Sequence, residues 1–179
     1  MEKTDSEVQL IGFLVENDRD KIETKRPDKL AEFDEKIGRK RISPTSFYSV
    51  EDTLRYQQVA CEILFGEYNE ENVRKMGQID AELVQSTQFG KIAFSLFIRE
   101  LKSGLMNFPK LVNSVYRGIS VEATEKGEKE VELVFQNDPY LKTYFQGLFE
   151  GGMKILGLEG EVQVVDEPGD KRRFTVKWE

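Results

Sequence analysis

Apolar residues recur at the three- and four-residue spacing of amphipathic helices over much of the chain before Gly118. Ser49 is expected to cap one of these helices, and Asn69 to cap the next. An apolar run over 7–16 differs, because its branched side chains and short length favour a buried strand, although a short helix remains open. The helices are predicted over these ranges: 27–37, 51–66, 70–84, 89–98 and 111–116.

The helix over 89–98 and the segment that follows it differ from the rest of this region. The helix is apolar on most sides, which predicts that it is the central and most buried one. Gly104 and Pro109 are expected to break the helical region before the short helix over 111–116, since glycine and proline both disfavour a helix interior.

After Gly118 the apolar positions alternate, which predicts antiparallel strands with one buried face. Two strands are expected on either side of a turn at Lys126-Gly127. A helix then begins with Asp138 as its cap and Pro139 in its first turn. A turn of type II over 167–170 joins two further strands. The predicted order is strand, strand, helix, strand, strand, over these ranges: 119–124, 130–135, 139–155, 161–165 and 173–178.

The bulk composition bounds the class of protein. A chain of 179 residues fits one globular domain over 1–179, with 1–6 as a disordered tail. Its net charge of −7 disfavours nucleic-acid binding. The single cysteine excludes an intrachain disulfide, and the chain shows neither a signal peptide nor an apolar run that could span a membrane. We therefore expect a cytoplasmic protein.

Histidine is absent from these 179 residues. Its absence excludes Ser-His-Asp and Cys-His nucleophile systems, a histidine-ligated haem and zinc sites that contain histidine. One cysteine cannot hold an iron–sulfur cluster or a thiolate zinc site. The sequence therefore predicts no metal and no cofactor.

Three glycines, Gly147, Gly151 and Gly152, lie within the last predicted helix, where each costs roughly 1 kcal/mol relative to alanine. That cost indicates that something approaches this helix closely. Tight packing against the sheet or a neighbouring helix is one explanation. The floor of a groove or a contact between subunits is the other.

The cysteine, the acidic pairs and the aromatic residues each allow more than one interpretation. Cys61 lies close to an apolar helix stripe, which favours a small buried hydrophobe over a reactive or acylated thiol. Acidic pairs lie mostly at helix starts and turns, where capping and solubility explain them better than acid/base catalysis does. The aromatic residues form either a core or an apolar pocket. They are Phe89, Phe94, Phe97, Tyr140, Tyr144, Phe145 and Phe149.

The segments over 131–139, 144–156 and 174–178 resemble an uncharacterised bacterial branch of one superfamily, and 47–66 and 85–91 do so as well. The superfamily includes TRAPP Bet-three-type subunits, vinyl reductase-like ligand domains and haem nitric-oxide-binding domains. The resemblance implies an α+β fold, with a helical N-terminal half packed on a twisted four-stranded antiparallel sheet. It also implies homodimerisation and, in several relatives, an apolar pocket. The haem-binding relatives use a proximal histidine, which this chain lacks.

These observations favour a non-enzymatic cytoplasmic homodimer that binds a hydrophobic small molecule or a protein partner. A structural scaffold without a ligand is the second hypothesis, and an acid/base enzyme is the third. A cavity among the aromatic residues would favour the binding module, a filled core the scaffold, and two carboxylates converging in a cleft the enzyme. The apolar pocket or interface is expected to contain Phe94, Phe97, Tyr144, Gly147, Leu148 and Gly151.

Overall fold

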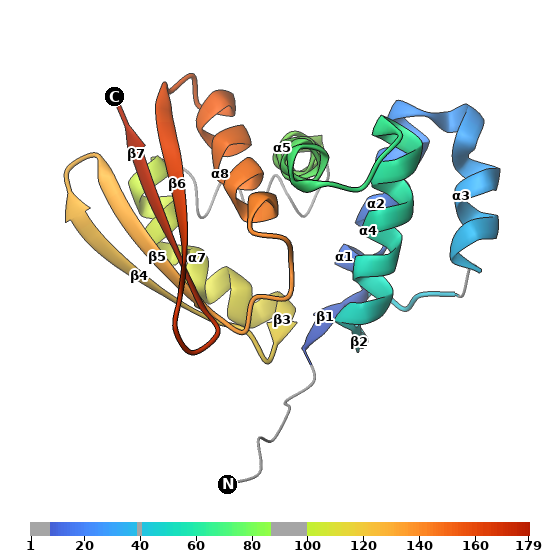
Figure 1. Ribbon diagram of the computed structural model, residues 1–179, viewed down its shortest axis with the longest axis horizontal. Coiled ribbons are helices and arrows are strands. Elements are labelled where there is room, and N and C mark those ends of the chain that lie inside the picture. The colour runs from blue at the N-terminus through green and yellow to red at the C-terminus, as the bar shows by residue number, and fades with distance from the viewer. Residues whose placement is uncertain (1–7, 39–40, 87–99) are drawn as a thin grey trace, which may run out of the picture.

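Helices and two antiparallel sheets make up the computed structural model, which describes residues 8–38, 41–86 and 100–179 (Figure 1). The strands are β1 Gln9–Ile11, β2 Phe47–Ser49, β3 Tyr116–Arg117, β4 Ser120–Gly127, β5 Glu130–Gln136, β6 Gly160–Glu167 and β7 Lys171–Trp178. The helices are α1 Gly12–Val15, α2 Asn17–Lys25, the 3-10 helix η1 Pro27–Lys29, α3 Leu30–Ile37, α4 Val50–Phe65, α5 Glu70–Ser86, α7 Leu101–Val115 and α8 Thr143–Ile155.

Four strands form the larger sheet in the order β4-β5-β7-β6, and every neighbouring pair is antiparallel. Alternation sets its buried face: Leu133 pairs with Phe174 and Val131 with Val176, and all four side chains are buried. α7 packs against β4 and β5, and α8 packs against β6 and β7 (Figure 1). The predicted α+β class and the order of the C-terminal elements are confirmed.

The helical N-terminal half meets this assembly mainly through α5, which packs along α8 (Figure 1). α2, α3 and α4 pack on one another on the far side of α5. A smaller sheet in the order β2-β1-β3 connects the two halves, because β1 and β2 belong to the N-terminal half and β3 follows α7. This sheet was not predicted, since its strands are short and distant in sequence.

The apolar run over 7–16 forms a strand only in β1. At Gly12 the chain turns into α1, and the Gly12 amide donates to the Ser46 carbonyl with an N···O distance of 2.8 Å. A Cβ atom on residue 12 would lie 2.0 Å from the carbonyl oxygen of Ser43, so the turn requires glycine. The prediction of a continuous strand is therefore wrong for 12–15, which are helical.

α7 runs through Gly104 and Pro109 without the predicted break. Its apolar face includes Leu105 and Val112, which are buried in the core. Burial of that face in the core stabilises the helix by more than the missing N–H group of the proline costs it. The predicted break is therefore wrong. The predicted central helix over 89–98 lies outside the described residues.

α8 begins at Thr143 rather than at Pro139, so this predicted boundary is also wrong. Asp138 does not cap the helix. Its Oδ1 accepts from the Tyr140 amide (3.0 Å), which closes a turn before the helix, and its Oδ2 accepts from Arg172 of β7 (2.8 Å). The turn is therefore fixed to the sheet, and the helix can begin only after it.

The two predicted N-terminal caps are confirmed. Ser49 Oγ accepts from the Glu51 amide (3.3 Å) at the start of α4, and Asn69 Oδ1 accepts from the Asn72 amide (2.9 Å) at the start of α5. None of the helices in the described ranges has both the length and the hydropathy needed to cross a lipid bilayer.

α5 and α8 pack with their backbones in close contact. A Cβ atom on Gly77 would lie 2.1 Å from the carbonyl oxygen of Tyr144, and a Cβ atom on Gly147 would lie 1.9 Å from that of Arg74. The close approach that the glycines of α8 predict is therefore made at Gly147 and Gly151 by α5, a neighbouring helix, and not at Gly152. This contact also fixes the position of Tyr144 along α5.

Candidate functional site

A buried group of charged side chains lies where α2 meets α5. Lys21 Nζ is 2.5 Å from Asp18 Oδ1 and 2.7 Å from Asp80 Oδ1. None of these three side chains is more than 5% exposed. One ammonium group therefore bridges two carboxylates inside the protein, and the three groups together carry one net negative charge when all are ionised.

Asp80 also connects α2 with α8. Its Oδ1 accepts from Asn17 Nδ2 (2.7 Å), and its Oδ2 accepts from the hydroxyl of Tyr144 (2.8 Å). Since Asn17 and Lys21 belong to α2 and Tyr144 to α8, one carboxylate of α5 holds three helices together. A change in the charge or position of this carboxylate would act on both halves of the molecule.

Burial and the neighbouring charges shift the pKa values of Asp18 and Lys21. Burial raises the pKa of Asp18, Lys21 opposes that effect, and the charge of Asp80 adds to it. Burial alone would lower the pKa of Lys21, but Asp18 and Asp80 outweigh it and leave that pKa raised. Lys21 therefore remains protonated, while Asp18 is a group at which a further proton or positive charge would be stabilising.

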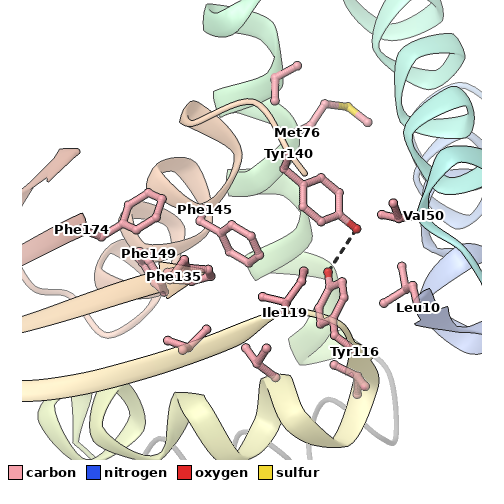
Figure 2. Close-up of a cluster of buried hydrophobic side chains, with 14 of the residues drawn as sticks. Leu10, Val50, Met76, Tyr116, Ile119, Phe135, Tyr140, Phe145, Phe149 and Phe174 are labelled. Atoms are coloured by element: carbon pink, nitrogen blue, oxygen red, sulfur yellow. Dashed lines mark hydrogen bonds between the residues drawn. The ribbon is translucent and has the colours of Figure 1, made fainter. Parts of the chain in front are cut away.

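Three tyrosines lie next to the charged group. The Tyr116 hydroxyl donates to the Tyr140 hydroxyl (3.2 Å), and the Tyr140 and Tyr144 rings stack with their centroids 4.7 Å apart. Figure 2 shows Tyr116 and Tyr140 between the phenylalanine cluster at the sheet and the side chains of Leu10 and Val50. Burial raises the pKa of all three phenols, which are therefore neutral at physiological pH.

A small cavity lies between the charged group and the tyrosines. Its volume is about 40 Å³, which is enough for one to a few water-sized groups. Thr53 of α4 lines it and is only 4% exposed, yet its hydroxyl has no hydrogen-bond partner among the residues described. Such a buried hydroxyl costs roughly 1–3 kcal/mol, which a polar molecule in the cavity would offset. The lining consists of Leu10, Leu14, Asn17, Asp18, Lys21, Thr53, Gln57, Tyr116, Tyr140 and Tyr144.

The phenylalanines beside the cavity fill their part of the core. Phe135 contacts Phe145 and Phe174 with ring centroids 4.7 and 5.0 Å apart, and Phe149 packs on Phe174 at 5.7 Å (Figure 2). The two kinds of aromatic residue therefore differ: the described phenylalanines form core, and the tyrosines border the cavity. Phe89, Phe94 and Phe97 lie outside the described residues.

Four of the residues predicted for an apolar pocket or interface lie together where α8 packs on α5: Tyr144, Gly147, Leu148 and Gly151. Of these, Tyr144 also lines the cavity. Because Phe94 and Phe97 are not described, the apolar pocket stays a prediction.

Sequence analysis missed Asp18, Lys21 and Thr53. Nothing local in the sequence of α2 distinguishes a buried charge from a solvated one. The one signal was the spacing of three between Asp18 and Lys21, which places both on one helix face. No group of three His, Cys, Asp or Glu side chains within the described ranges could hold a metal ion.

Cys61 is fully buried on α4, and its Sγ donates to the Glu67 carbonyl (3.4 Å). Burial raises the pKa of the Cys61 thiol to about 11. We therefore expect an aromatic disulfide reagent at pH 8 to react at least about 100-fold more slowly with the native protein than with the protein unfolded in urea. Absorbance of the released thiolate measures both rates, and a rapid native reaction would contradict the burial.

Several solved structures share this fold. A single-residue variant of an H-NOX domain designated Tt has a TM-score of 0.77 at 17% identity, over 95% of this chain and 95% of that chain. An oxygen-binding H-NOX domain related to soluble guanylate cyclases, in its oxygen complex, gives 0.75 at 17% identity over 94% of each chain. A mutant of T. tengcongensis H-NOX gives 0.72 at 18% identity, over 94% of this chain and 97% of that one.

At these identities the matches establish a shared fold, so the resemblance to haem nitric-oxide-binding domains is confirmed at that level. The resemblances to TRAPP subunits and vinyl reductase-like domains stay predictions. A search of curated proteins finds no match to this chain. The family described as "Protein of unknown function (DUF2378)" matches residues 29–179, which is most of the chain, and the protein therefore belongs to that family.

Proposed function

We propose that this protein is a non-catalytic module that binds a small molecule in the cavity between α2, α4 and the three tyrosines. The observation that carries the proposal is the buried hydroxyl of Thr53, which lines the cavity without a partner among the described residues. The fold supports it, since one solved structure of this fold is an oxygen-binding domain. Fold alone does not define a ligand, so the ligand class follows from the cavity itself.

The cavity limits the size and polarity of the ligand. Its volume of about 40 Å³ is far below the roughly 300 Å³ or more of pockets for drug-sized molecules. Its polar lining includes Asn17, Thr53 and Gln57. The proposal is therefore a polar molecule of a few non-hydrogen atoms, in place of the hydrophobic molecule expected from the aromatic content.

Haem does not fit this site. The chain contains no histidine to serve as the proximal ligand that the resemblance implies. The sulfur of Cys61 is no substitute, since its pKa is raised to about 11 and it donates to a backbone carbonyl. The described residues leave about 40 Å³ beside the tyrosines, whereas a porphyrin needs a pocket of roughly 300 Å³ or more.

Asp18 and Asp80 meet one condition of the acid/base hypothesis, because both are buried and approach a common point. Lys21 occupies that point, however, and hydrogen-bonds to both carboxylates. A glycoside or a substrate of similar size also cannot enter about 40 Å³. The geometry therefore supports ligand binding over acid/base catalysis.

Homodimerisation and a cytoplasmic location are also part of the proposal. The resemblance implies the first, and the free buried thiol of Cys61 is consistent with the reducing environment of the second. Native mass spectrometry of the purified protein measures both the oligomeric state and any retained ligand. A monomeric mass would remove the dimer from the proposal without affecting the cavity.

Thr53→Val provides the central test of the cavity. Valine has nearly the same shape as threonine and lacks the hydroxyl, so the ligand-free variant should be more stable than wild type by about 1 kcal/mol. It should also lose most of the stabilisation that small solutes confer on the wild type. Thermal unfolding in a panel of neutral, cationic and anionic solutes, each with about four or fewer non-hydrogen atoms, measures both effects.

Thr143→Val is the matched control. Thr143 is also buried, and its hydroxyl also lacks a partner among the described residues, but it does not line the cavity. The control should gain a similar stability without changing the response to any solute. Binding in the cavity would be disproved if no solute stabilised the wild type, or if Thr53→Val and Thr143→Val responded alike.

A further inference from the structure

We infer that the ligand of this cavity is a small cation with N–H donors, of the ammonium or methylammonium class; this inference rests on the proposed function. The first argument is charge. Asp18 and Lys21 line the cavity, and Asp80 contacts the same Lys21 ammonium. The remaining polar residues of the lining are neutral, so Asp18, Lys21 and Asp80 give the site one negative charge in excess when all three are ionised. A buried excess charge of this kind favours a cation and disfavours an anion.

The hydrogen-bonding groups of the lining support the same class. Asp18 brings a carboxylate to the lining whose Oδ1 accepts from Lys21, and a carboxylate can accept more than one hydrogen bond. The hydroxyl of Thr53 supplies a second oxygen, which accepts from no described residue. Thr53 belongs to α4, whereas Asp18 belongs to α2. A cation with several N–H donors can bond to both oxygens, and its bond to Asp18 is strong because the carboxylate and the donor are both charged.

The tyrosine rings add a third, independent attraction. Tyr116, Tyr140 and Tyr144 all line the cavity, and the faces of aromatic rings attract ammonium groups. The volume of about 40 Å³ admits a cation of one or two non-hydrogen atoms and excludes quaternary ammonium groups. Charge, oxygen acceptors and aromatic rings thus define one ligand chemistry, which differs from that of a neutral polar molecule of equal size.

Four probes separate this inference from the broader proposal. Methylammonium chloride and methanol have the same two non-hydrogen atoms and differ in charge; sodium formate is anionic, and tetramethylammonium chloride is cationic but too large. So small a ligand is expected to have a Kd on the order of 10 mM. At about 100 mM and constant ionic strength, methylammonium should then raise the Tm of the wild type by about 3 °C or more, and the other three by less than about 1 °C.

Asp18→Asn is the decisive variant, because it retains an oxygen that can accept from Lys21 and removes only the charge. It should abolish the methylammonium shift, and Thr53→Val should reduce it, so the test still holds if one variant fails to fold. Stabilisation by methanol or formate in place of methylammonium would overturn the cationic class and leave the proposed function intact. Equal shifts in Asp18→Asn and wild type, or from tetramethylammonium, would also overturn it. No shift from any probe would overturn both.

Discussion

Replacing Gly147 with alanine is expected to lower the free energy of unfolding by about 3 kcal/mol. The new Cβ atom would lie 1.9 Å from the carbonyl oxygen of Arg74 and 2.8 Å from its carbonyl carbon. Both atoms belong to the backbone of α5, so the clash cannot be relieved by rotating a side chain. The two helices must separate, which also disturbs the bond between Tyr144 and Asp80. For a chain of this size the Tm should fall by roughly 6–12 °C.

Gly152→Ala is the matched control on the same helix. Apart from its chain neighbours and the nearby backbone of α8, no atom of the described residues lies within 4 Å of the position that its Cβ would take. Because alanine is the better helix former, this substitution should raise the free energy of unfolding by up to about 1 kcal/mol. Urea unfolding followed by circular dichroism measures both variants. Opposite signs are expected, and a gain of similar size in both would show that helix propensity, rather than contact with α5, dominates at these glycines.

The glycines illustrate what the sequence can and cannot predict. Their cost in a helix interior signals a close approach without revealing the partner, because Gly77 of α5 and Gly147 of α8 are distant in the chain. The larger sheet was predictable for the opposite reason: alternation within each strand and the turns between neighbouring strands are local signals. Caps such as Ser49 are equally local.

The errors occur where tertiary contacts override local preference. Pro109 would end an isolated helix, but α7 gains enough from its buried face to continue. Pro139 would begin a helix, but Asp138 is bound by Arg172 of β7, which no local pattern reveals. In both places the predicted element exists and its boundary is wrong.

The candidate site was beyond sequence reasoning because its lining comes from elements spread over most of the chain. Thr53 of α4, Lys21 of α2 and Tyr116 of β3 meet only in the folded protein. Of the cavity residues, Tyr140 and Tyr144 were singled out, and their aromatic character was the reason. Charge gave no help, because a buried Lys21 and an exposed lysine look the same in a sequence.

Replacing Lys21 with methionine is expected to lower the free energy of unfolding at neutral pH by about 3–5 kcal/mol. Methionine preserves much of the side-chain volume but leaves Asp18 and Asp80 buried without their shared counter-charge. In the variant the pKa of Asp18, which burial already raises, should rise further above the ordinary value of about 3.9, so protonation favours the folded state. The decrease in the free energy of unfolding should therefore have its full size near pH 7 and should become smaller as the pH falls toward about 4. Urea unfolding at several pH values measures this dependence.

Two further variants identify the cause as the uncompensated charge. Adding Asp18→Asn to Lys21→Met removes one of the two carboxylates and should restore at least half of the lost stability, a coupling that a double-mutant cycle quantifies. Lys29→Met removes an exposed ammonium that pairs with Glu32, and it should change stability by no more than about 0.5 kcal/mol. If the loss in Lys21→Met were independent of pH and unaffected by Asp18→Asn, altered packing would be its cause, and the excess negative charge beside the cavity would not be a real feature of the site.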